Sequence, residues 1–263
     1  MYAFEITINN SHVLKYDDFE HHIFAYLRFL QDNGQILPKD DHLPIIQGKT
    51  TKITVVCPEQ DSLSTKYMNQ YARQMNDKIV QGTGNLITHQ LVGYDYDYPL
   101  PRFAPPNQSQ FYVLRYGWSS PIIDGITHQG IPLYHLPMQD CDDRFIDELW
   151  SWYRQAQALY RLWLGSVPDT EAFALQHRQS VDSSHSQIGR KLCQQIETVT
   201  GVPTYYFLAN YRDWSKAADL NQKCPLTGQD WRIDSKISNY IDFKCDKSRL
   251  VSEFSQNCAD NDI

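Results

Sequence analysis

Two short stretches near the C-terminus determine how the last part of the chain is expected to fold: "KCPLTGQDWRI" (Lys223–Ile233) and "FKCDKSRLVS" (Phe243–Ser252). Each stretch begins like half of a zinc ribbon, in which two C-x-x-C turns face each other across a small sheet. The two pairs of such a ribbon are usually separated by about 15–20 residues. The chain keeps this arrangement, but each stretch has one cysteine where a ribbon has two.

The second ligand position of each pair carries a hydroxyl. Cys224 is followed three residues later by Thr227, Cys245 is followed three residues later by Ser248, and seventeen residues separate Thr227 from Cys245. Hydroxyls stay protonated near neutral pH and are weak ligands beside a thiolate, and structural zinc sites almost always have four ligands. We therefore expect Cys224 and Cys245 to be remnant ligands of a metal-free ribbon that needs no cofactor. A disulfide between them stays open.

The same residues resemble a bacterial family of unknown function that is described as zinc-ribbon-containing and as a candidate for nucleic-acid binding. Its pattern is Cys-Pro-x-Cys-Gly-x-x-Trp followed by Asp-Phe-x-Cys-Asp-x-Cys-Arg-Leu-x-Ser. The matching residues are Cys224, Pro225, Gly228, Trp231, Asp242, Phe243, Cys245, Asp246, Arg249, Leu250 and Ser252. The resemblance implies a zinc site, but the family's two remaining ligands fall on Thr227 and Ser248, so this chain carries the ribbon in degenerate form.

Charge argues against nucleic acid as the main partner. The chain of 263 residues has a net charge of -7, and an acidic protein does not attract phosphate through its overall field. A local basic patch remains conceivable within the ribbon, formed by Lys244, Lys247 and Arg249 with Phe243. Nucleic-acid binding is therefore the alternative function rather than the leading one.

Hydrophobic periodicity predicts an α+β fold. Alternating apolar residues indicate a strand at residues 2–8, and helical spacing indicates helices from Ser64 to Ile79 and from Asp140 to Leu164. We expect a mixed N-terminal sheet with helices, a helical middle at about 140–200 and a small C-terminal zinc-ribbon-like β appendage. The expected domains are an α+β main body at 1–215 and a ribbon-like subdomain at 221–256.

A loop rich in aromatic residues and acids offers a surface for a protein partner. Aromatic side chains bury a large area at low entropic cost, and acids would select a basic partner. The predicted contact residues are Tyr94, Asp95, Tyr96, Asp97, Tyr98 and Phe103. The leading function is thus non-enzymatic binding, with contact to another protein of unknown identity. An acidic inhibitor of a basic protein is one form that this function could take.

Other classes receive less support. The chain has no P-loop, dinucleotide-binding glycine fingerprint, G-x-S-x-G or H-E-x-x-H motif, so an enzyme stays an open alternative without assigned catalytic residues. The start "MYAFEITINN" does not look like a secretory signal, and no apolar run reaches the roughly 18 residues of a membrane helix. The six cysteines are scattered, which favours free thiols. We expect a cytoplasmic protein with no membrane partner.

Overall fold

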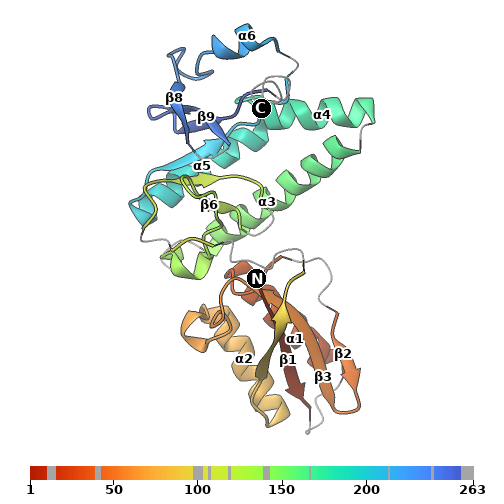
Figure 1. Ribbon diagram of the computed structural model, residues 1–263. Coiled ribbons are helices and arrows are strands. Elements are labelled where there is room, and N and C mark those ends of the chain that lie inside the picture. Colours follow the sequence, from red (N-terminus) through yellow and green to blue (C-terminus); the bar gives the residue numbers. More distant parts are fainter. Residues whose placement is uncertain are drawn as a thin grey trace. The chain divides into compact units, whose positions relative to one another are not determined.

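The computed structural model describes residues 1–10, 16–38, 43–96, 103–105, 108–117, 120–138, 143–165, 167–212, 214–237 and 240–255. The chain is a mixed α+β protein, 40% helical and 24% strand, with two sheets, a helical middle and C-terminal strands (Figure 1). This confirms the fold class predicted from the sequence. Contacts divide the chain into two compact units, residues 1–103 with 131–139 and residues 104–130 with 140–263.

The first unit has the order β-α-β-β-α-β. Its elements are β1 (Tyr2–Asn9), α1 (Tyr16–Asp32), β2 (Ile45–Gln47), β3 (Thr50–Cys57), a 3-10 turn (Thr65–Tyr67), α2 (Gln70–Thr83), β4 (Thr88–Tyr94) and a second 3-10 turn (Leu133–His135). The strands pair antiparallel in the order β2-β3-β1-β4. This is the arrangement of the ferredoxin-like split βαβ motif, and it leaves β2 and β4 at the edges.

The two helices of this unit share one core with the sheet. Phe4, Ile6 and Ile8 alternate along β1 and are buried against apolar side chains of α1 and α2. Between these positions lie residues of the other face, where Glu5 forms an ion pair with Lys52 of β3 at 2.8 Å. The sheet is therefore apolar on one face and polar on the other.

The helix predicted from Ser64 begins later than expected. The Ser64 side chain accepts a hydrogen bond from the Lys66 backbone, but it caps only the 3-10 turn at Thr65–Tyr67. The α2 helix begins after Asn69, whose side chain accepts a hydrogen bond from the Ala72 backbone at 2.8 Å. Both residue types are good caps, and the sequence pattern alone could not separate them.

In its described residues, the second unit combines four α-helices with a six-stranded sheet. The helices are α3 (Asp143–Leu164), α4 (Pro168–Gln179), α5 (Ser184–Thr200) and α6 (Lys216–Leu220), and the strands are β5 (Tyr112–Leu114), β6 (Ile122–Asp124), β7 (Thr204–Phe207), β8 (Arg232–Ile237), β9 (Ile241–Cys245) and β10 (Leu250–Ser252). The strand order is β6-β5-β7-β10-β9-β8. Strand β7 runs parallel to both β5 and β10, and the remaining pairs are antiparallel.

The C-terminal strands continue the sheet of this unit. The Tyr206 backbone donates to the Arg249 carbonyl and the Leu208 backbone donates to the Val251 carbonyl, both at 2.9 Å. The boundary predicted between residues 215 and 221 therefore lies inside the second unit, since the ribbon-like hairpin and the main body share one hydrogen-bonded sheet.

Candidate functional site

The first ribbon turn is built by backbone hydrogen bonds around Cys224. Its carbonyl accepts from the Thr227 and Gly228 backbone at 3.3 and 2.8 Å, and its own N–H donates to the Gln229 carbonyl at 2.9 Å. Gly228 has a φ of 68°, in the left-handed region where glycine carries no steric penalty. The turn has the tight form that a ribbon knuckle requires, although Thr227 stands at its second ligand position.

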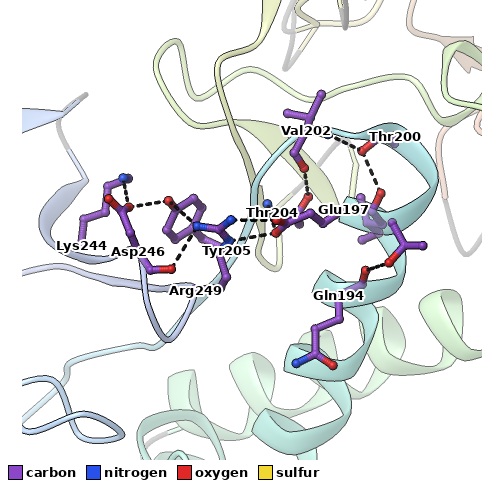
Figure 2. Close-up of polar contacts among 11 residues, drawn as sticks. Gln194, Glu197, Thr200, Val202, Thr204, Tyr205, Lys244, Asp246 and Arg249 are labelled. Carbon is purple, nitrogen blue, oxygen red and sulfur yellow. Dashed lines mark hydrogen bonds and ion pairs between the residues drawn. The ribbon is translucent and has the colours of Figure 1, made fainter.

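The second turn repeats this form with arginine in the position of the glycine. Arg249 follows Ser248 as Gly228 follows Thr227, and its φ is 53°. A side chain in this region is strained, so the conformation needs support from outside the turn. Glu197 of α5 provides it by accepting hydrogen bonds from Arg249 Nε and Nη2 at 2.9 and 2.7 Å (Figure 2).

The four side chains at the predicted ligand positions come together. The Cys224 Sγ lies 3.2 Å from the Ser248 Oγ, and the Cys245 Sγ lies 3.6 Å from the Thr227 Oγ1. Each thiol thus pairs with a hydroxyl of the opposite turn. Both cysteines are buried. We call these four residues the thiol–hydroxyl cluster.

The Cys245 thiol of the cluster is surrounded by hydrogen-bonding groups. Burial raises the pKa of the Cys245 thiol, but hydrogen bonds with Ser248, Thr227 and Cys224 outweigh burial and lower this pKa to about 7. The cluster can therefore stabilise a thiolate at Cys245 without a metal ion, because hydrogen bonds to the charged form favour it.

The donor set of the cluster does not fit a structural zinc ion. Such an ion takes four thiolate or imidazole ligands, and two of the four positions here are alcohols. Within the described part of the chain, no group of three or more histidine, cysteine, aspartate or glutamate side chains could hold a metal ion. Aromatic packing also joins the two halves of the ribbon-like region. The Trp231 and Phe243 ring centroids lie 5.4 Å apart, and Phe254 meets Phe243 edge-on at 5.0 Å.

The predicted nucleic-acid patch has intramolecular partners. Lys244 pairs with Asp246, which also accepts a hydrogen bond from the Tyr205 hydroxyl at 2.5 Å, while Arg249 is held by Glu197 (Figure 2). Phe243 is fully buried, so its ring is not available for stacking on a base. Lys247 is the exposed cation of the four residues. Glu197 was missed by the sequence analysis, because a single acid on a helix gives no signal of its partner.

The predicted protein-contact loop divides into exposed and buried residues. Tyr94 and Tyr96 are 64% and 96% exposed, whereas Asp95 is buried and its backbone donates to the Met1 carbonyl at 2.9 Å. Phe103 packs against the small apolar cluster of Met1, Leu37 and Val56. Asp97 and Tyr98 lie outside the described residues. Two tyrosines are thus presented outward, and the acid between them is not.

Comparisons with known proteins define a class without a named activity. Three protein-family models match, each described as a domain of unknown function: DUF8589 over residues 1–93, DUF2310 over residues 104–209 and DUF8594 over residues 214–258. The last of these begins close to the boundary predicted from the sequence, although the strands that it covers extend the sheet of the preceding region.

Two proteins of Haemophilus influenzae are similar to this chain. One is 32% identical over 232 residues, which cover 86% of this chain and 87% of that protein. The other is 35% identical over 173 residues, covering 64% and 82%. Each is described only as an uncharacterised protein. The chain belongs to the same family as these proteins. No solved structure matches it.

No helix among the described residues combines the length and apolar character needed to span a membrane.

Proposed function

We propose that this chain is a non-enzymatic binding protein that contacts another protein through the edge of β4. A single observation carries this proposal: three large apolar side chains at the end of edge strand β4 and just beyond it, Val92, Tyr94 and Tyr96, are 55%, 64% and 96% exposed. Exposed apolar residues are ordinary when scattered, but adjacent ones are typical of interaction surfaces. Tyrosine is also enriched where protein partners meet.

The geometry of β4 favours contact through side chains. In the register with β1, Ala3 faces Gly93 and Phe4 faces Leu91, so Val92 is the extra residue of a bulge. A bulge at an edge disturbs the ladder and hinders addition of another strand. The Tyr94 ring packs on Tyr2 at 5.6 Å, which holds it in place at the surface. We therefore infer that the partner packs on the tyrosines.

The structure supports this function better than nucleic-acid binding. Sequence-tolerant recognition of single strands needs exposed aromatic rings beside unpaired cations. Here Tyr94 and Tyr96 stand on the first unit, and Lys244 and Arg249 of the ribbon are paired with Asp246 and Glu197. We further propose that the ribbon has lost its metal function and that the protein acts in the cytoplasm. Free thiols at Cys57, Cys193, Cys224 and Cys245 are consistent with a reducing compartment.

The test is affinity purification of the tagged chain from its native host, followed by mass spectrometry. The double variant Tyr94→Ser with Tyr96→Ser should recover at least tenfold less of the specific partner than the wild type does. The matched control is Leu86→Ser, because Leu86 is 74% exposed in the same unit but lies outside the β4 surface. Retention of every partner by the double variant, or capture of nucleic acid that is released by salt, would contradict the proposal.

A further inference from the structure

A pocket in the second unit contains two arginines that the ribbon and β4 do not involve. Its cavity volume is about 30 Å³, and its lining includes Arg115, Arg178, His185, Trp152 and Phe207. In the structure Arg178 lies in the last turn of α4 and His185 in the first turn of α5.

Neither arginine has a carboxylate partner among the described residues. Arg178 Nη2 donates to the Tyr211 hydroxyl at 3.2 Å, and its guanidinium lies 4.8 Å from the Tyr211 ring centroid. Its Nη1 is buried without a hydrogen-bond partner in that part of the chain. The Arg115 guanidinium lies 4.0 Å over the Phe207 ring, and its Nη1 is 3.2 Å from Nε2 of His128. Aromatic faces attract these cations, but they do not neutralise them.

The histidine of the pocket is buried near Arg178. His185 is 5% exposed and stacks on Trp152 with the ring centroids 5.0 Å apart. Its Nδ1 is buried and unpartnered among the described residues. Burial lowers the pKa of His185 to about 4, with further lowering by Arg178 and His177. Likewise, burial and then Arg115 lower the pKa of His128 to about 4.

One acid lies near both arginines without pairing with them. Burial raises the pKa of Glu253, while Arg115 and Arg178 lower it. No ion pair joins Glu253 to either arginine. The arginines themselves are half-buried, but Nη1 of Arg178 and Nδ1 of His185 are buried without a partner among the described residues, and such polar groups call for one.

We propose that this pocket is a binding site for the oxyanion group, a carboxylate or a phosphate, of a small ligand held between Arg115 and Arg178. A guanidinium fork matches both groups in geometry. Nδ1 of His185 can offer a further hydrogen bond. The limited space restricts the ligand to a small molecule.

The experiment uses the full chain in chloride buffer, with inorganic phosphate and benzoate added at matched ionic strength. Thermal unfolding and isothermal titration measure binding, since a ligand that binds the native state raises the midpoint. We expect one of the two anions to raise the unfolding midpoint. The anion that does so shows whether the site prefers a phosphate or a carboxylate. The variants Arg178→Met and Arg115→Met should each bind at least tenfold more weakly. Arg232→Met, which removes an exposed arginine of the same unit, should bind as the wild type does.

A second measurement on the wild-type protein tests the proposal even if the arginine variants fail to fold. The His185 ring signals of the wild-type protein, assigned by comparison with His185→Gln, should move when the anion is added. Arg178→Lys keeps the charge without the fork and should weaken binding at least threefold. No response to either anion would overturn the proposal. A response that survives both arginine-to-methionine changes, or that leaves the His185 signals unmoved, would also overturn it.

Discussion

The thiol–hydroxyl cluster and the arginine pocket differ in whether their polar groups find partners inside the protein. Cys224 and Cys245 each meet a hydroxyl of the opposite turn. Nη1 of Arg178 and Nδ1 of His185 are buried and meet no partner among the described residues. The polar groups of the cluster thus satisfy one another, whereas an unsatisfied buried group needs a partner such as a water molecule, an ion or a ligand.

Restoring the two missing ligands should have the largest effect. The double variant Thr227→Cys with Ser248→Cys places four thiols where the backbone turns already bring four side chains together. We expect it to hold one zinc ion per chain and to gain about 4 kcal/mol in unfolding free energy when free zinc is near 1,000 times the dissociation constant. Elemental analysis and thermal unfolding with and without a chelator measure both quantities.

The wild-type chain and the single variants serve as controls for zinc. The wild type should carry no stoichiometric zinc, and a chelator should leave its unfolding midpoint unchanged. Each single variant, with three thiols, should bind more weakly than the double variant. One tightly held zinc ion in the wild type that is lost in Cys224→Ser would contradict this prediction, because the cluster would then hold a ligand as the arginine pocket is proposed to do.

A glycine beside the pocket tests how closely its wall is packed. A Cβ on Gly189 of α5 would collide with the Tyr206 ring and lie 2.9 Å from Nε1 of Trp152. Gly189→Ala should destabilise the protein by about 1–3 kcal/mol, as overpacking of a core does. Urea unfolding measures the change. Gly165→Ala is the control, because the nearest atoms to its Cβ would be at 3.5 Å, and it should change stability by less than about 0.5 kcal/mol.

The thiol–hydroxyl cluster should have a pH dependence of its own. The pKa of Cys245 in the folded state, about 7, lies below the value of roughly 8.5 for an unfolded thiol. Its contribution to stability is therefore fully present above the unfolded pKa and is lost as pH falls through about 7. We expect the wild type to gain on the order of 1–2 kcal/mol relative to Cys245→Ser between about pH 6 and pH 9. Parallel stability curves of the two proteins would contradict a lowered pKa.

The sequence predicted most of the ribbon and little of the pocket, for physical reasons. The ribbon turns are local, so the spacing of Cys224, Thr227, Cys245 and Ser248 was enough to place four side chains together. The α+β class also followed from periodicity. Arg115 comes after β5 and Arg178 from α4, and only the fold brings them to one cavity. No spacing rule detects such a pair.

The sequence also did not predict which residues of the aromatic and acidic loop are buried. Asp95 alternates with Tyr94 and Tyr96, which predicted one acidic and aromatic surface. In the structure Asp95 is buried while both tyrosines are exposed. The partners of the basic residues escaped the sequence for a similar reason, since Arg249 is held by an acid 52 residues away along the chain.

The left-handed residue of the second ribbon turn gives the smallest and most specific effect. Arg249→Ala loses the two hydrogen bonds to Glu197 and keeps the strain of a positive φ, whereas Arg249→Gly loses the same bonds and removes the strain. The glycine variant should therefore be more stable than the alanine variant by about 1 kcal/mol, even though glycine loses more backbone entropy on folding. Urea unfolding of the two variants measures the difference, and Lys247→Ala against Lys247→Gly, on the same turn without a positive φ, should show the opposite order. Equal stability of the two Arg249 variants would mean that the turn relaxes once Glu197 is released. In that case the helix contact, rather than the backbone of the turn, would set the shape of the cluster.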